Sequence, residues 1–440
     1  MKRIWRGTCT FICITICLIM PIQQSSAKEK REWKDEVVYS IMIDRFNNGD
    51  AKNDIDLNTE NLEEYQGGDI SGIIKRLDYI KDMGFTAIML SPLFESKKYD
   101  GTGGGNQQQV NEHFGSLQDV RQLVKEAHKK DMKVIFQFIA REENPRQMVD
   151  VVKWWIQEVN IDGSYFIHSE KLSNDSLHDM KKQLKDIKKD FVVLTDEKES
   201  VHSDYYKAIT NAFSKTDRSI QPLYRVSLIG ADQVMNTYID HQNTKRFVRL
   251  VKENGYYPPA RLKLALAYLY TSPGLPIVYY GTEIALDGGS VPDNRRLMDF
   301  KTDEKFLRYI TKLGELRKEL PSLRRGTFEL LHDEEGMSVL KRTYKNEVTI
   351  IALNNTKVTK KVALPANIVG EKQQLRGLLE DEIIREEGGK YYLVLKREEA
   401  NIYKAGEQTS INWVFVSMIV LINLIFIAFL IAVKKRRKQV

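Results

Sequence analysis

Cysteine is almost absent from this 440-residue chain, which has three cysteines, all within the first 17 residues. The rest of the chain therefore has no thiol for a disulfide, a nucleophile or a metal-binding thiolate. Proline is also scarce, with 11 residues, and no internal repeat or low-complexity tract is present. These absences exclude a disulfide-stabilised small domain, a thiol enzyme and a repeat protein.

A basic surface for nucleic acid is also lacking, although the formal net charge is +7. Three of the positive charges lie in the first six residues and five more lie in residues 434–438, which leaves the intervening chain at −1. A nucleic-acid backbone is held by Lys and Arg gathered on one surface. We therefore expect no nucleic-acid partner.

Long apolar runs occur only near the two ends of the chain. At the amino terminus, basic residues precede an apolar run that ends at the small residues Ser25, Ser26 and Ala27. This order predicts a secretory signal peptide over residues 1–27, with an uncleaved anchor as the alternative.

At the other end, residues 413–433 are mostly apolar and long enough to cross a bilayer as one helix. The basic tail that follows, residues 434–440, is typical of the cytoplasmic side. We expect a single-pass transmembrane helix that holds the body of the protein outside the cell. Because that body has no disulfide, a bacterial cell membrane is favoured.

Between these ends, short apolar runs alternate with amphipathic patterns typical of helices. The expected strands are 36–43, 86–90, 132–138, 160–168, 191–194, 224–229, 237–240 and 276–280. About eight strand–helix pairs predict an α/β fold, a TIM (β/α)8 barrel, over residues 28–320. Short strands separated by turn residues then predict an antiparallel β-sandwich over residues 321–405.

Four segments in this order resemble motifs of the α-amylase family, glycoside hydrolase family 13. They are residues 38–46, 67–73, 273–283 and 293–300. The resemblance extends from about residue 35 to residue 404, and it implies the same barrel with a saccharide site on one face. In such retaining enzymes a nucleophilic carboxylate and an acid carboxyl flank the scissile bond, and they project from strand ends.

The resemblance is weakest where this chemistry should lie. It places Ile167 at the position of the nucleophile and Asn243 at the position of a third carboxylate. The candidate acid is Asp196, or Glu197 if the alignment slips by one residue. Because an isoleucine side chain has no lone pair to attack an anomeric carbon, the sequence favours a pseudoenzyme.

The amino-terminal calcium loop of the family has a counterpart here. Calcium binds about 6 to 8 oxygen atoms from carboxylates, amides and carbonyls. The resemblance implies a ligand set of Asn48, Asp50, Asn53, Asp54, Gly67 and Asp69. The alternative is a turn rich in Asn and Asp that binds no metal.

A substrate-binding pair is also implied, because Tyr99 and Asp100 resemble the pair on which the family stacks its innermost sugar. The insert at about residues 91–115, which contains a polar Gly-rich stretch, is shorter than the domain that family enzymes carry there. The alternative interpretation of Tyr99 is an aromatic residue that packs on the barrel rim.

Two functions therefore remain open. The first is a membrane-anchored extracellular domain, inactive in catalysis, that binds α-glucan polysaccharide or oligosaccharide or contacts another membrane protein. The alternative is an active α-glucosidic hydrolase with a displaced nucleophile. A pair of carboxyl groups about 5 to 9.5 Å apart across the cleft would favour the enzyme.

Overall fold

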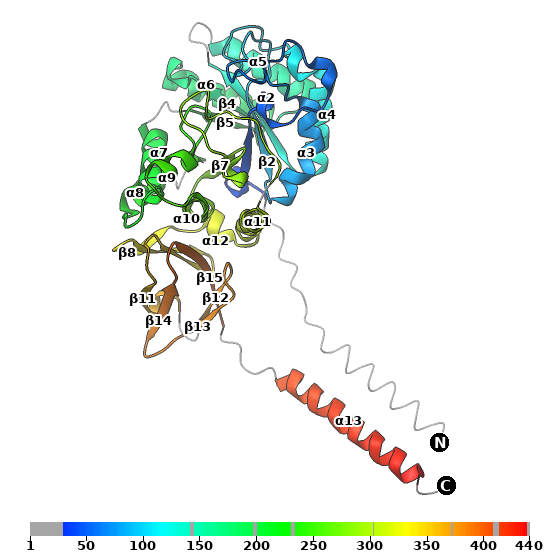
Figure 1. Ribbon diagram of the computed structural model, residues 1–440, viewed down its shortest axis with the longest axis vertical. Coiled ribbons are helices and arrows are strands. Elements are labelled where there is room, and N and C mark those ends of the chain that lie inside the picture. Colours follow the sequence, from blue (N-terminus) through cyan, green and yellow to red (C-terminus); the bar gives the residue numbers. More distant parts are fainter. Residues whose placement is uncertain are drawn as a thin grey trace. The chain divides into compact units, whose positions relative to one another are not determined.

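The computed structural model describes residues 30–140, 145–196, 200–229, 234–301, 303–370, 373–407 and 413–437. The predicted signal peptide, residues 1–27, and the candidate acid Glu197 lie outside these residues. Figure 1 shows helices packed around a central parallel sheet, and a second, antiparallel group of strands in the carboxy-terminal part of the chain.

The central sheet has seven described strands in the order β5-β4-β3-β2-β1-β7-β6. Every described strand pair in it is parallel. Their bounds are β1 Val38–Ile41, β2 Ala87–Leu90, β3 Lys133–Ile139, β4 Gly163–Ile167, β5 Val192–Thr195, β6 Asn236–Thr237 and β7 Leu275–Tyr279. Because both faces of the sheet are covered, these strands are short apolar runs, as the sequence indicated. The structure thus confirms a barrel-like parallel sheet.

One predicted strand is wrong. Residues 224–229 belong to the helix α8, Gln221–Ile229, which has a proline at its second position. Leu223 and Ser227 are buried four residues apart, on one face of that helix. A short apolar run alone does not distinguish a strand from a helix. The two edges of the sheet are nevertheless linked, because Asn236 Nδ2 donates a hydrogen bond of 3.1 Å to the Thr195 carbonyl oxygen.

The helices around the sheet follow the strands in alternation. They are α3 Ile70–Asp82, α4 Leu117–Lys129, α5 Pro145–Val159, α6 Asn174–Ile187, α7 Ser200–Phe213, α8, α9 Phe247–Glu253, α10 Pro258–Thr271, α11 Glu304–Glu319 and the short α2 Ile43–Phe46 and α12 Pro321–Arg325. Local sequence fixes several of these ends. For example, Ser116 and Asp119 form a reciprocal capping box at the start of α4.

The interior of the barrel is an apolar core of its own. Successive residues of a strand point to opposite faces, so one set faces the helices and the other faces inward. The inward set includes Val38, Ala87, Met89, Ile135, Tyr165, Ile167, Val192, Leu194, Leu275 and Ile277. The interior is thus filled by side chains, and Ile167 is part of this core.

The carboxy-terminal strands that the structure describes are all antiparallel. Six form a sheet in the order β13-β12-β15-β10-β9-β8, and β11 pairs with β14. Their bounds are β8 Glu329–Glu334, β9 Met337–Tyr344, β10 Glu347–Asn354, β11 Lys360–Pro365, β12 Gln373–Gly377, β13 Ile383–Arg385, β14 Lys390–Leu395 and β15 Glu399–Glu407. Side chains of both groups share one apolar core. The antiparallel fold expected for this region is confirmed.

The last described element is the helix α13, Trp413–Arg437, whose apolar side chains from Met418 to Ile431 are exposed. The predicted transmembrane segment, residues 413–433, extends beyond the side chains that the structure describes. Within the described part of the chain, no helix has the length and hydropathy needed to cross a membrane.

Candidate functional site

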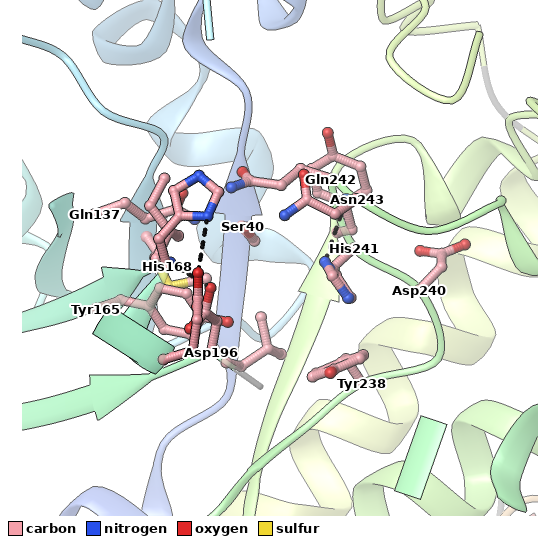
Figure 2. A pocket seen from close by; sticks show the side chains of 15 residues that line it. Ser40, Gln137, Tyr165, His168, Asp196, Tyr238, Asp240, His241, Gln242 and Asn243 are labelled. Atoms are coloured by element: carbon pink, nitrogen blue, oxygen red, sulfur yellow. Dashed lines mark hydrogen bonds and ion pairs between the residues drawn. The ribbon is translucent and has the colours of Figure 1, made fainter. Parts of the chain in front are cut away.

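A cavity of about 230 Å³ lies at the carboxyl ends of the barrel strands. In (β/α)8 barrels, functional sites form at this face. Figure 2 shows residues of the β3–β5 side of the cavity, such as Gln137, His168 and Asp196, facing the segment 238–243. The cavity is lined by Ser40, Met89, Gln137, Tyr165, Ile167, His168, Glu170, Asp196, Tyr238, Asp240, His241, Gln242, Asn243, Ile277 and Tyr279.

The deep side of the cavity is continuous with the apolar interior of the barrel. We call this side the apolar floor and define it by Met89, Tyr165, Ile167, Tyr238 and Ile277, which line the cavity and belong to the interior core. Ile167 is 3% exposed. The position at which the resemblance implies a nucleophile is therefore an isoleucine within the apolar floor.

Asp196, the candidate acid, lines the cavity just beyond β5. Its carboxylate accepts hydrogen bonds from the backbone N–H groups of His168, at 2.6 Å, and Ser169, at 2.9 Å, and from the Ser169 hydroxyl at 2.5 Å. These hydrogen bonds fix the turn after β4, in which His168 has a positive φ of 59°. Asp196 therefore positions the cavity wall, and its oxygens already bind protein donors.

Asp240 is a second carboxyl at the cavity. Its Oδ2 accepts the Phe247 N–H at 2.8 Å, and its Oδ1 lies 3.9 Å from Arg246 Nη1. Burial raises the pKa of this carboxyl, and the charge of Arg246 opposes that rise. Figure 2 shows Asp240 beyond His241, well apart from Asp196. The third carboxyl, Glu170, is largely exposed and lies 3.6 Å from His168 Nδ1.

Polar atoms in the cavity wall lack protein partners. Among the described residues, Gln137 Oε1, Tyr279 Oη and Asp240 Oδ1 are buried and have no hydrogen-bond partner. Gln137 is 2% exposed and Tyr279 is 1% exposed. An unpartnered buried polar group costs about 1–3 kcal/mol, so native structures contain few of them. A ligand with hydroxyl groups could satisfy these atoms.

The implied substrate-binding pair, Tyr99 and Asp100, contacts two arginine side chains. Tyr99 is buried, with the guanidinium of Arg45 3.9 Å from its ring centroid. Arg295 Nη1 donates to Tyr99 Oη at 3.2 Å and to Asp100 Oδ2 at 2.9 Å. Neither Tyr99 nor Asp100 lines the cavity. These contacts match the alternative interpretation, a packed rim aromatic, and sugar stacking on Tyr99 stays a prediction.

Arg295 also connects this pair to the cavity. Its Nη2 donates to Asn243 Oδ1 at 3.1 Å, and its Nε donates to the Gln242 carbonyl oxygen at 3.0 Å. Asn243, where the resemblance implies a third carboxylate, is thus held by a hydrogen bond from Arg295.

Part of the implied calcium set does come together. Asn48 Nδ2 donates to both carboxylate oxygens of Asp54, at 2.8 and 3.0 Å. Gly67 has a φ of 88°, and a Cβ there would lie 2.8 Å from Asn48 Nδ2 and 3.1 Å from Asp54 Oδ1. Asn53 Oδ1 is buried and has no hydrogen-bond partner among the described residues, which suits a metal ligand.

Two members of the set have protein partners instead. Asp69 caps α3 through the Gly72 N–H and also accepts the N–H groups of Gly49 and Asp50. Asp50 Oδ1 accepts the Lys52 N–H. In the described part of the chain, no three or more His, Cys, Asp or Glu side chains form a group that could hold a metal. Calcium binding therefore stays a prediction.

Comparison with known proteins places this geometry in a family. The family model for the α-amylase catalytic domain matches residues 40–143, and that for the α-amylase C-terminal domain matches residues 326–403. A solved α-amylase from Anoxybacillus is 41% identical, with a TM-score of 0.83, over 87% of this chain and 100% of that one. This chain belongs to the α-amylase family.

Other α-amylase family members support the same conclusion. The α-amylase of Geobacillus thermoleovorans, solved with acarbose, is 37% identical with a TM-score of 0.80, over 86% of this chain and 100% of that one. A cyclomaltodextrinase of Thermoanaerobacter pseudethanolicus is 28% identical over 74% of this chain and 71% of its own. These relatives are named as enzymes, which favours the hydrolase alternative over the inactive domain expected from the sequence.

Several residues that line the cavity are not predicted from the sequence as ligand-binding residues. Gln137, Tyr238 and Tyr279 are examples, and each lies at or near the carboxyl end of a strand of the central sheet. That position was the available signal, because barrel sites form at strand ends. Which of these polar atoms lack partners depends on packing between distant segments.

Proposed function

We propose that the cavity of this α-amylase family member binds an α-glucosidic saccharide. The observation that carries the proposal is one cavity that combines the apolar floor with buried polar atoms for which the described part of the chain supplies no hydrogen-bond partner. A sugar ring has C–H groups on its faces and hydroxyl groups around its edge. It therefore suits a cavity that is apolar on one side and has a few fixed polar groups on the other.

We infer further that binding is not followed by the cleavage usual in the family. The retaining mechanism needs a nucleophilic carboxylate beside an acid carboxyl. Ile167 cannot form a covalent sugar intermediate, since its side chain has no lone pair. In addition, the Asp196 carboxylate already accepts three hydrogen bonds from the turn after β4.

A second candidate function is hydrolysis of an α-glucosidic bond. The enzyme names of the relatives favour it. In this case Asp196 or Glu197 would act as the acid, with a carboxyl other than residue 167 completing the pair. Asp196 would have to exchange a backbone N–H partner for the glycosidic oxygen.

One experiment separates these functions. For the purified full-length chain, calorimetry would measure binding of maltotriose, and turnover would be measured on soluble starch and an aryl α-glucoside. We expect binding without turnover. Turnover that is lost in Asp196→Asn or Glu197→Gln would overturn the inactive interpretation and name the acid. If neither binding nor turnover is seen, the saccharide proposal itself fails.

We also propose that calcium binds the loop that contains Asn48, Asn53 and Asp54. A ligand that binds only the folded state stabilises it by about 2.7 kcal/mol at a concentration 100-fold above its Kd. Adding millimolar calcium to the chelator-treated protein should therefore raise the melting temperature, by roughly 2–4 °C for each kcal/mol in a protein of moderate size.

Matched variants test the position of the calcium. Asp54→Asn should abolish the thermal shift. Asp56→Asn makes the same change two residues away at an exposed side chain, so it should retain the shift. Equal melting temperatures with calcium and with chelator in the unmodified chain would refute calcium binding.

A further inference from the structure

We propose that Gln137 and Tyr279 are the polar groups that bind one uncharged sugar ring in the cavity. This inference rests on the saccharide binding proposed above. It adds which side chains recognise the sugar and which sugars the site rejects.

The first support is the position of the two side chains. Gln137 lies in β3 and Tyr279 is the last residue of β7, and both line the cavity. Gln137 Oε1 can only accept hydrogen bonds, whereas Tyr279 Oη can donate and accept. Both atoms are buried and have no hydrogen-bond partner among the described residues. Sugar hydroxyl groups, which donate and accept, can satisfy both.

The second support is the size and floor of the cavity. Pockets that enclose drug-sized ligands have volumes of about 300–1,000 Å³. This cavity, at about 230 Å³, is smaller, and the apolar floor closes its deep side. One ring fits this space better than several, with a C–H face of the ring against Ile167 and Met89.

The third support is the charge of the wall. The described lining residues include the carboxyl groups of Glu170, Asp196 and Asp240, and none of them is Lys or Arg. Anionic sugars such as uronic acids and sugar phosphates are usually bound through Arg or Lys. The lining residues that the structure describes offer no such partner, and the carboxylates among them repel anions. It should therefore select neutral sugars.

Calorimetric binding of maltotriose to the full-length chain and to two variants tests the polar contacts. Gln137→Leu and Tyr279→Phe should each weaken binding about tenfold, the size expected for one lost hydrogen bond of about 1.4 kcal/mol. Neither variant should lower the melting temperature, because Gln137 Oε1 and Tyr279 Oη have no hydrogen-bond partner among the described residues. This combination distinguishes sugar recognition from a structural role.

The matched control is Tyr270→Phe. The Tyr270 hydroxyl is also buried and has no partner in the described part of the chain, but it lies in α10 and does not line the cavity. Tyr270→Phe should leave the affinity unchanged. If the unmodified chain binds maltotriose and Gln137→Leu and Tyr279→Phe bind it equally well, this inference fails while saccharide binding stands. If the unmodified chain does not bind, both fail.

Ligand competition tests the charge selection. Glucose and glucose 6-phosphate would be titrated separately against bound maltotriose. Glucose should displace it at a concentration at least about tenfold below that needed for the phosphate. Equal displacement by both sugars would overturn the proposed preference for uncharged rings.

Discussion

Replacing Ile167 by aspartate will lower the free energy of unfolding by about 3–5 kcal/mol at neutral pH instead of creating a nucleophile. Ile167 is 3% exposed and packs in the apolar core that fills the barrel. The substitution removes buried methyl groups and introduces a negative charge. The described lining residues of the cavity include no Lys or Arg that could pair with this charge.

The loss should depend on pH in a defined direction. A carboxyl in this apolar position will have its pKa raised above the unfolded value of about 3.9, because burial disfavours the charged form. The folded state then binds more protons than the unfolded state between these two pKa values. The deficit of Ile167→Asp should therefore be smallest below about pH 4 and grow as the pH rises through the folded-state pKa.

Urea unfolding at several pH values measures this effect. Ile167→Asn, which has nearly the same shape as aspartate but no charge, should be destabilised without the pH-dependent part. Ile167→Leu should cost less than about 1.5 kcal/mol, because it conserves volume. If Ile167→Asp is as stable as the unmodified chain, or hydrolyses starch, then position 167 accommodates a carboxylate, and the expectation that aspartate there only destabilises the fold is incorrect.

The sequence predicted the features that depend on neighbouring residues. The runs at 86–90 and 132–138 became β2 and β3 because each is a continuous apolar segment of strand length. The run at 224–229 satisfied the same rule and became part of a helix, since the burial of Leu223 and Ser227 was not visible from the pattern.

The candidate site was predictable only in part, because some of its features depend on contacts between residues that are distant in the sequence. The resemblance located Ile167, Asp196 and Asn243, and all three line the cavity. The burial of Tyr99 depends on Arg45 and Arg295, which are 54 and 196 residues away in the sequence. Whether Gln137 Oε1 and Tyr279 Oη find hydrogen-bond partners among the described residues likewise depends on segments that are distant in the sequence. No local pattern encodes such contacts.

Arg317→Met will also lower the free energy of unfolding by about 3–5 kcal/mol, although Arg317 does not line the cavity. Arg317, in α11, is fully buried and donates to backbone carbonyl oxygens of several segments. They are those of Tyr270 at 2.7 Å, Gly274 at 2.8 Å, Leu323 at 3.1 Å, Lys34 at 3.1 Å and Ser272 at 3.4 Å. Methionine fills most of the volume but donates no hydrogen bond, so these carbonyl groups would lose a buried partner.

The position of these carbonyl groups explains the size of the expected effect. Tyr270 is near the carboxyl end of α10, where helix carbonyls lack partners within the helix. Gly274 immediately precedes β7, which supplies Tyr279 to the cavity. Leu323 lies in α12, which connects the barrel to the antiparallel strands along the chain. One guanidinium thus satisfies groups from four segments, which the compact ammonium of Arg317→Lys could do only in part.

Urea unfolding of the full-length chain measures the loss, and Arg308→Met is the matched control. Arg308 lies in the same helix, is 67% exposed and pairs with Glu304 four residues earlier. An exposed pair of this kind contributes about 0.3–0.5 kcal/mol, so the control should remain close to the unmodified chain. Equal stabilities of Arg317→Met and Arg308→Met would mean that water or other donors replace the guanidinium, and that the segments meeting at Arg317 do not depend on it.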